Sequence, residues 1–179
     1  MLISNYRYNN IARQCEKYRL AALTSVKNKG AFSTAIDALQ KQADDAGEET
    51  AFAIGVFDCD DLKYVNDHYG HDKGDIYLKT ACQLICRIFD HSPVFRIGGD
   101  EFAVILRNQD YGNREQLVSQ FEKERDRINA DNENEWKQVH IAMGIAVFDP
   151  KTDSYVIDTV RRADKVMYAD KQARKQTRK

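Results

Sequence analysis

The positions of apolar residues divide the chain into helices and strands. A spacing of three to four residues, which puts apolar side chains on one helix face, runs through residues 11–22, 32–39, 78–89 and 117–128, and residues 156–175 are expected to close the chain as a helix. Short continuous apolar runs, typical of buried strands, occupy residues 51–57, 94–97, 102–106 and 139–148. We therefore predict regular structure over nearly the whole chain.

The order of these elements predicts the fold class. From residue 51 the order is β-α-β-β-α-β and then a helix, which is the ferredoxin-like or palm arrangement, an α/β (α+β) fold with an antiparallel central hairpin and flanking helices. The run Gly98-Gly99-Asp100-Glu101 between two strand-like segments indicates the hairpin. If the outer strands pair against the two hairpin strands, Asp58 and Asp100 become neighbours.

Length and charge limit the function. A chain of 179 residues suffices for one domain with a short appendage. With a net charge of -1, the molecule as a whole does not attract nucleic acid or an anionic membrane, so any anion has to be bound locally. Neither an apolar run of about 18 residues nor a signal-peptide core occurs, and we expect a cytoplasmic protein or the cytosolic part of a larger sensor.

Two groups of carboxylates follow predicted strands. Asp58 comes after the buried run 51–57, where a carboxylate is costly unless it is solvated, paired or bound to a metal. In the hairpin tip, glycines let a phosphate or a nucleobase approach the backbone, while Asp100 and Glu101 can hold a cation. The three carboxylates together predict a site suited to Mg²⁺, and the alternative from spacing alone is a flexible acidic turn.

These residues resemble a known family. Residues 95–102, Phe-Arg-Ile-Gly-Gly-Asp-Glu-Phe, are similar to the motif that defines the GGDEF domain, and residues 58–75 are similar to that family's D-x-D-x-[FL]-K-x-x-N-D…G-H-x-x-G-D run. Leu23-Thr24 with Asn28 resembles the opening landmark, and Ala163-Asp164 with Tyr168 and Lys171 resembles the closing one. The resemblance implies a lead-in helix at 1–22, the domain at 23–176 and a tail at 177–179.

The resemblance also implies the roles of individual residues. The metal, Mg²⁺ with Mn²⁺ as the alternative, would be bound by Asp58, the Cys59 backbone carbonyl, Asp100 and Glu101, and the last two would be catalytic. The residues implied to bind GTP are Lys63, Asn66, Asp75, Gly98, Gly99, Lys171 and Lys175. Among these, Asn66 and Asp75 match the acceptor and donor atoms of the guanine edge, and the lysines neutralise the triphosphate.

The activity implied by the resemblance is that of a diguanylate cyclase, which condenses two GTP into the bacterial second messenger cyclic di-GMP and releases pyrophosphate. The 3′-hydroxyl of one GTP attacks the α-phosphorus of the other, and Asp100 or a metal-bound water takes the proton. Because each domain binds one GTP, a two-fold homodimer is implied during turnover. Fusion to a sensory or regulatory domain is expected, and neither nucleic acid nor membrane is an expected partner of this chain.

The chain departs from the family pattern at both ends. Ala21 and Ser25 replace the acid and the glycine of the opening motif. At the other end, Lys175 replaces a phosphate-binding arginine, which keeps the charge but loses bidentate geometry.

The family's R-x-x-D feedback site is also out of register here. Arg87 and Asp90 have the right letters, but the residues from His91 to Ile97 separate them from Gly98, and the in-register positions are Phe89 and Ser92. We expect the usual feedback site to be absent and Arg87 and Asp90 to form an ordinary helix-end pair.

Three other functions are compatible with parts of the pattern. A degenerate domain could bind GTP or cyclic di-GMP without turnover. This function is compatible with the departures from the family pattern at Ala21, Ser25 and Lys175. A cyclase of altered base selectivity could accept ATP, although Asp75 favours guanine. An unrelated palm-type polymerase fragment would share the carboxylates but would need a basic template groove, which the sequence lacks.

Overall fold

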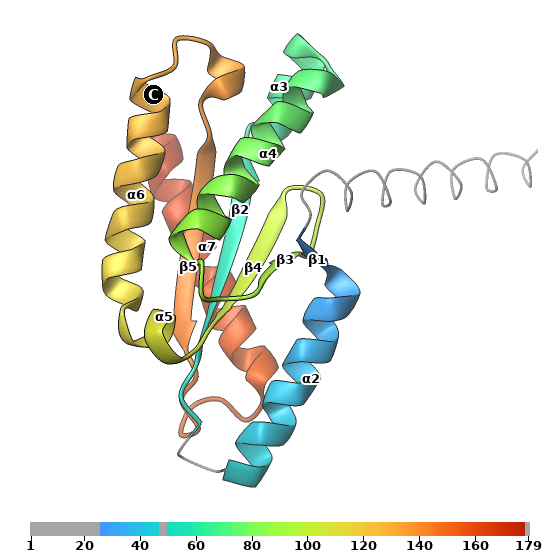
Figure 1. Cartoon of the computed structure of the whole chain (residues 1–179), viewed down its shortest axis with the longest axis vertical. Helices are drawn as coiled ribbons and strands as arrows, with labels where there is room; N and C mark the ends of the chain where they lie inside the picture. Colours follow the sequence, from blue (N-terminus) through green and yellow to red (C-terminus); the bar gives the residue numbers. More distant parts are fainter. Residues whose placement is uncertain (1–25, 47–49, 178–179) are drawn as a thin grey trace, which may run out of the picture.

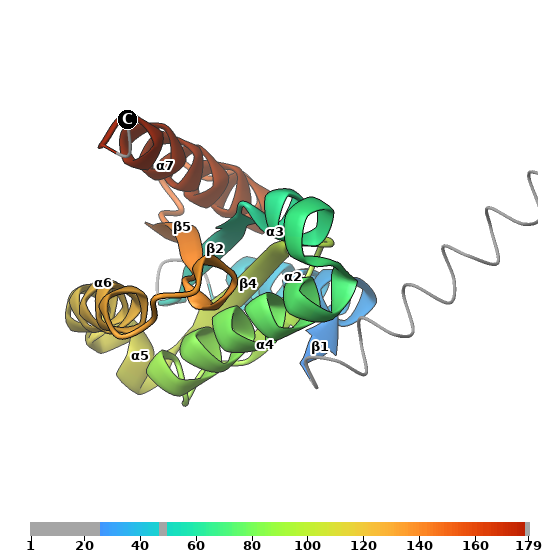
Figure 2. The same cartoon turned by 90° about the horizontal axis from the view of Figure 1, so that it is seen from above.

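Helices cover both faces of a five-stranded sheet in the part of the chain that the computed structural model describes, residues 26–46 and 50–177 (Figure 1, Figure 2). In chain order the elements are β1 (Lys27–Asn28), α2 (Lys29–Ala46), β2 (Ala53–Asp60), α3 (Leu62–Tyr69), α4 (His71–Ile88), β3 (Val94–Arg96), β4 (Glu101–Leu106), α5 (Asn108–Gly112), α6 (Arg114–Ala130), the 3₁₀ turn η2 (Glu135–Lys137), β5 (His140–Val147) and α7 (Val156–Thr177). The predicted palm-like α+β fold is confirmed. The lead-in helix predicted at 1–22 lies outside the described residues.

The strand order β1-β3-β4-β2-β5 corrects one detail of the prediction. β2 pairs antiparallel with β4 on one side and with β5 on the other, so β5 does not pair with the hairpin. The outer hairpin strand β3 has only three residues, and its other edge pairs in parallel with β1. By contrast, all eight residues of β2 pair with residues of β5. Asp58 therefore meets the hairpin through the β2–β4 pairing, opposite Glu101.

Alternate residues of β2 enter two separate cores, because neighbouring side chains of a strand point to opposite faces of the sheet. Phe57 packs toward α4 and α6, with its ring centroid 5.5 Å from that of Phe89 and 5.4 Å from that of Phe121. Ile54 and Val56 belong to the other core, which includes buried residues of α2 and α7. Burial on both faces explains why this strand is a continuous apolar run rather than an alternating one.

Two boundaries near the carboxylates differ from the prediction. β2 does not stop at Asp58 but continues to Asp60, because Asp58, Cys59 and Asp60 pair with residues 140–142 of β5. Gly74 lies inside α4 and not in a turn, since Gly70, with a φ of 85°, already makes the turn between α3 and α4. The sequence pattern missed α3, whose eight residues include a single buried one, Val65.

Helix α7 lies directly on β5 at Gly144. A Cβ atom at this position would come within 2.1 Å of the Ala163 carbonyl oxygen and 2.2 Å of the Met167 nitrogen, both in the backbone of α7. One turn further along, the Met143 backbone N–H donates to the Asp170 carboxylate at 3.0 Å. The absence of a side chain at Gly144 therefore allows the close contact of α7 with the sheet.

No helix within the described ranges is both long and apolar enough to cross a membrane.

The contact at Gly144 gives a stability prediction. Gly144→Ala should destabilise the domain by about 1–3 kcal/mol, because the new methyl group overlaps backbone atoms that cannot move alone. Gly112→Ala is the matched control, since nothing lies within 4 Å of the Cβ position there. Urea unfolding followed by circular dichroism measures both variants, and equal midpoints for the two would contradict the prediction.

Candidate active site

The residues predicted to recognise guanine lie in one pocket beside the β3–β4 turn. The cavity measures about 360 Å³, and α3, α4 and the turn provide its walls. Five residues named from the sequence line it: Lys63, Asn66, Asp75, Gly99 and Asp100. The apolar side chains of Leu62 and Leu78 complete the lining together with polar groups such as His71 and Arg96. A pocket with apolar surface and a few convergent polar groups is the usual form of a small-molecule site.

Asn66 takes its place because α4 carries no side chain at Gly74. A Cβ atom there would lie 1.9 Å from the Asn66 Oδ1 atom, so the amide of α3 rests where that side chain would be. The two helices are joined by Gly70, whose backbone N–H donates to the Asn66 carbonyl oxygen at 3.0 Å. The glycines of the 66–75 segment thus set the position of the amide relative to Asp75.

Arg96 was quoted as part of the motif, but sequence reasoning gave it no role. Its side chain is 7% exposed and lines the pocket. The guanidinium donates to the Gly98 carbonyl oxygen at 3.3 Å and to the Gly99 carbonyl oxygen. Burial lowers the pKa of Arg96, whereas the charges of Asp75 and Asp100 act in the opposite direction. Arg96 therefore stabilises, through these hydrogen bonds, the turn that contains Asp100. Its charge also interacts with those of Asp75 and Asp100 in the pocket.

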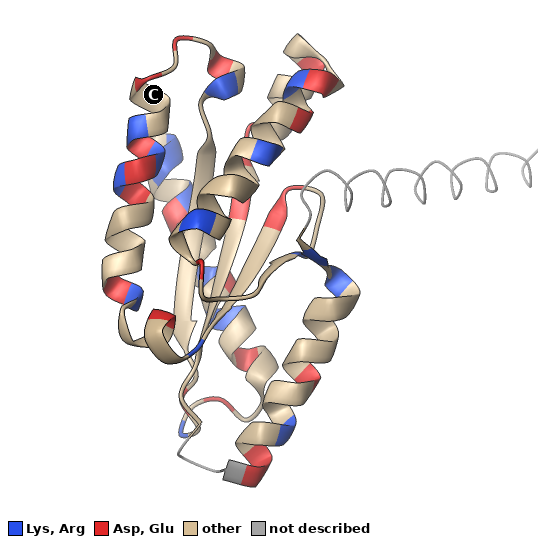
Figure 3. Cartoon of the chain, in the orientation of Figure 1, with Lys and Arg blue, Asp and Glu red and all other residues tan. Residues whose placement is uncertain are grey.

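The carboxylates of the hairpin and of β2 meet at one end of the sheet, where Figure 3 shows acidic residues at the ends of β2 and β4. The Cys59 backbone N–H donates to the Asp100 carbonyl oxygen at 2.9 Å, which confirms that Asp58 and Asp100 are neighbours. Burial raises the pKa of Glu101, and the charges of Asp100 and Asp58 raise it further. Such crowding of carboxylates favours a cation between them.

The two glycines of the turn have different surroundings. A Cβ atom at Gly98 would lie 2.2 Å from the Glu101 Oε2 atom, so the carboxylate of Glu101 folds over this residue. At Gly99 nothing lies within 4 Å of the Cβ position, and the backbone is open toward the pocket. Of the two, Gly99 is thus the one against which a ligand in the pocket could lie.

Lys171 of α7 reaches the carboxylates of β2. Its Nζ atom lies 2.6 Å from Asp58 Oδ1 and 3.1 Å from Asp60 Oδ1. Burial alone would lower the pKa of Lys171, but the hydrogen bonds to Asp58 and Asp60 raise it overall. Lys171 was predicted to bind the triphosphate, and in this structure its ammonium group contacts the two carboxylates. Lys175, one turn further along α7, is exposed.

The donor set fits a hard divalent cation. Asp58, Asp100 and Glu101 offer carboxylate oxygens at neighbouring positions of β2, β4 and the turn, and such oxygens are the ligands that Mg²⁺ and Mn²⁺ prefer. The ammonium group of Lys171 already stands among these groups as a positive charge. Since the Cys59 side chain is fully buried in the core, only its backbone carbonyl could take part.

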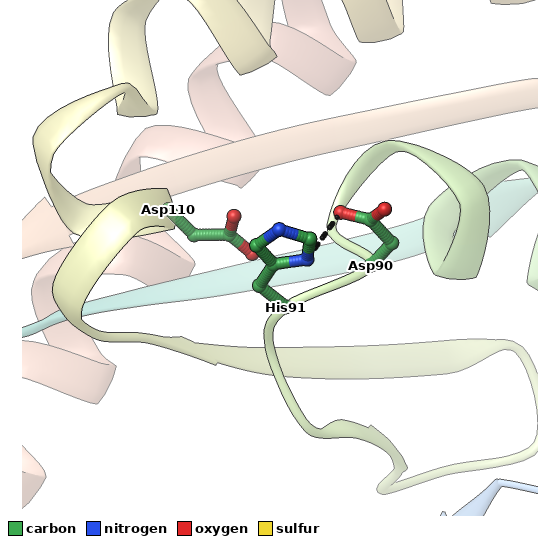
Figure 4. A group of neighbouring side chains, drawn as sticks. All are labelled: Asp90, His91 and Asp110. Atoms are coloured by element: carbon green, nitrogen blue, oxygen red, sulfur yellow. Dashed lines mark ion pairs between the residues drawn. The ribbon is translucent and has the colours of Figure 1, made fainter.

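A second group of potential metal ligands lies at the other end of the hairpin. Ligand atoms of Asp90, His91 and Asp110 lie within 4.8 Å of one another, and His91 contacts Asp90 at 2.9 Å (Figure 4). These residues precede β3 and follow β4, whereas the turn with Asp100 joins the opposite strand ends. The metal site predicted from the sequence, at Asp58, Asp100 and Glu101, is therefore a different group of residues.

The same region corrects the pairing predicted for Arg87. Its guanidinium donates to Glu124 of α6, whereas Asp90 contacts His91, so the two residues do not form the expected helix-end pair. The reason is that α4 packs beside α6, which brings Glu124 within reach of the last turn of α4. The in-register residues are Phe89, which is buried, and Ser92, which donates to Asp110 at 2.6 Å.

A clamp outside the predicted site holds α3 in place. The Glu135 carboxylate of η2 accepts hydrogen bonds from Tyr64 at 3.1 Å and from Tyr69 at 2.8 Å. Next to it, the ammonium group of Lys73 lies 4.0 Å from the centroid of the Trp136 ring. Sequence reasoning missed this clamp, because η2 follows α6 in the chain and only folding brings it against α3 and α4.

Comparisons with known proteins identify the family of this chain. A sequence profile of the family described as "Diguanylate cyclase, GGDEF domain" matches residues 20–177. The chain is 42% identical over 87 residues to the uncharacterized protein YhcK of Bacillus subtilis, a match that covers 48% of this chain and 24% of that protein. It is 28% identical over 153 residues to the probable diguanylate cyclase DgcT of Escherichia coli, covering 84% of this chain and 33% of that protein. The chain spans about a quarter to a third of the length of these relatives.

Solved structures share the fold. The coiled coil and GGDEF domain of DgcB from Caulobacter crescentus, in complex with c-di-GMP, superimposes with a TM-score of 0.70 at 23% identity, covering 96% of this chain and 92% of that one. The active GGEEF domain of a diguanylate cyclase from Vibrio cholerae gives a TM-score of 0.68 at 25% identity, covering 83% and 92%. Because the family profile spans nearly the whole described sequence and its motif residues meet at one end of the sheet, this chain belongs to the diguanylate cyclase GGDEF domain family.

Proposed function

We propose that the domain is an active diguanylate cyclase that condenses two GTP into cyclic di-GMP. The observation that carries the proposal is that the pocket lined by Asn66 and Asp75 extends to Asp100, which neighbours Asp58. A base bound at the first two residues would leave its phosphates near the carboxylates and the cation that they hold. The similarity to the probable diguanylate cyclase DgcT and the diguanylate cyclase DgcP of Escherichia coli supports the same activity.

Guanine is the base that this pocket suits. Asn66 offers an amide with both a donor and an acceptor, and Asp75 offers an acceptor for the N–H groups of the guanine edge. Adenine lacks that pair of N–H donors on its corresponding edge, so it would form fewer hydrogen bonds with Asp75 than guanine does. Arg96 lines the same pocket as Asp75, donates to the Gly99 carbonyl oxygen and interacts electrostatically with the charge of Asp75.

The metal is proposed to bind to Asp58, the Cys59 carbonyl, Asp100 and Glu101. When bound, a divalent cation stabilises the negative charge that develops on the α-phosphate and the departing pyrophosphate. The protein's own residues orient the nucleotide: Lys63 at the pocket neutralises phosphate charge, and Lys175, an exposed residue of α7, is available to do the same. Gly99 leaves room for the nucleotide against the turn.

In the proposed reaction, the 3′-oxygen of one GTP bonds to the α-phosphorus of the other, and the bond from that phosphorus to pyrophosphate breaks. The proton of the 3′-hydroxyl passes to Asp100 or to water. The second bond forms in the same way with the roles of the nucleotides exchanged, which needs two domains facing each other as a symmetric pair. We further propose that this occurs in the cytoplasm, under the control of domains outside this chain.

The first prediction about activity concerns Asp100. Asp100→Asn keeps the size of the side chain but removes its charge, and it should lower cyclic di-GMP formation at least about a hundredfold. The assay is incubation of concentrated domain with GTP and Mg²⁺, with chromatography of the product. Asp90→Asn is the matched control from the acidic group at the far end of the hairpin, and its activity should equal that of the wild type.

The same assay tests the alternative of a degenerate binding module. If the wild-type domain makes no product at any concentration, yet calorimetry detects binding of GTP with Mg²⁺, the domain is a regulatory binding module or needs a partner to dimerise. For an active cyclase, the specific activity should rise with protein concentration, because two domains form one catalytic unit.

The second prediction separates binding from stability. Gly74→Ala places a methyl group where Asn66 Oδ1 now lies, and the flexible amide should swing away from the pocket. GTP affinity should fall about tenfold or more, as for the loss of one hydrogen-bonding side chain, measured by calorimetry with a non-hydrolysable analogue. Helix propensity favours alanine, so the melting temperature should not fall. Unchanged affinity would argue against Asn66 as a guanine ligand.

A further inference from the structure

Lys171 occupies a position between two carboxylates of β2. Residues 58 and 60 point to the same face of the sheet, the face that α7 covers, because side chains alternate along a strand. The ammonium group lies 2.6 Å from Asp58 and 3.1 Å from Asp60. All three side chains are largely buried, with side-chain exposures of 21% for Lys171, 14% for Asp58 and 2% for Asp60. At such separations in a partly buried site, the ammonium group stabilises both carboxylates, while its single positive charge balances only one of their two negative charges.

The hydrogen bond to Asp58 is incompatible with full use of that carboxylate as a metal ligand. An ammonium group held at Asp58 Oδ1 repels a divalent cation that approaches the same oxygen. Binding of the cation therefore requires Lys171 to leave Asp58. The backbone of α7 is fixed to β5 at Gly144 and by the Met143–Asp170 hydrogen bond, so the side chain rather than the helix must move.

Asp60 offers Lys171 a second place to bind. Asp60 is 4% exposed, and its Oδ2 atom is buried without a hydrogen-bond partner among the described residues. Leaving such an oxygen unpaired is costly. A lysine that moves away from Asp58 while staying on Asp60 could donate to both oxygens of Asp60 and remove this cost. The unpaired oxygen thus makes the exchange easier, since the ammonium group does not have to return to water.

We propose that Lys171 is a positioning residue that serves as an internal counter-ion of the metal site. It holds Asp58 and Asp60 in place when no metal is bound, and it transfers to Asp60 when a divalent cation takes Asp58. Lys171 is then free to turn its third N–H donor toward the phosphates of the nucleotide. The inference rests on the proposed function only in placing the metal at Asp58.

The test measures metal affinity without nucleotide or turnover. Mn²⁺ is titrated into the whole chain, and free Mn²⁺ is followed by electron paramagnetic resonance. Lys171→Met should bind Mn²⁺ on the order of tenfold more tightly than the wild type, because the competing hydrogen bond is gone. Lys165→Met removes the same charge from an exposed position of α7 and should change the affinity far less. Equal affinities for Lys171→Met and the wild type would overturn the proposal.

A second variant covers a failure of the first to fold. Lys171→Met leaves Asp60 as a buried charge without its partner, which can unfold the domain. The double variant Lys171→Met/Asp60→Asn removes both members of that pair, and it should also bind Mn²⁺ more tightly than Asp60→Asn alone. Circular dichroism verifies the fold of each variant. A double variant no tighter than Asp60→Asn would contradict the role of Lys171.

Asp58→Asn in the same titration separates the two proposals. It should abolish Mn²⁺ binding if Asp58 is a metal ligand. If Asp58→Asn retains the wild-type affinity, the metal site of the proposed function is wrong, and the role of Lys171 falls with it. If Asp58→Asn loses binding while Lys171→Met matches the wild type, only the role of Lys171 is wrong.

Discussion

The repulsion among carboxylates at one end of the sheet is the constraint on which this structure depends. Asp58 and Asp60 lie on β2, and Asp100 and Glu101 lie beside them on the turn and β4. Partly buried acids at such positions need a compensating positive charge. Within the protein, Lys171 supplies it from α7. The same excess of negative charge favours binding of a divalent cation. Repulsion among these carboxylates therefore affects both the stability of the metal-free fold and its proposed chemistry.

The contact of Lys171 with these carboxylates depends on packing at some distance from them. Lys171 reaches β2 because α7 lies against β5 at Gly144, where the two backbones approach each other without a side chain between them. The pocket follows a similar logic: Gly74 admits Asn66, Arg96 braces the turn, and Glu135 clamps α3 through two tyrosines. Small residues thus provide the close approaches, and polar side chains then fix the geometry that these approaches allow.

Much of the fold was predictable, for physical reasons that act locally. The apolar run 51–57 and the helical stripe 78–89 reflect burial of individual segments, and both elements formed as expected. The pairing of β5 with β2 was not predicted, because it depends on which edge of the sheet is free once β1 covers β3. Likewise, Arg87 binds Glu124 rather than Asp90, since the packing of α4 on α6 brings together residues far apart in sequence.

By itself, the sequence determined the order of the main strands and helices, the family and the candidate residues of the site, because hydrophobic periodicity and contiguous motifs are local properties of a chain. Its motifs named Asn66, Asp75, Gly99 and Asp100, which the fold then brings to one pocket. Tertiary structure alone decided what faces these residues: that Lys171 lies on Asp58 and Asp60, that Glu101 covers Gly98, and that Arg96 holds the turn. Those contacts join distant segments, and their geometry depends on how helices and sheet pack, which no local pattern encodes.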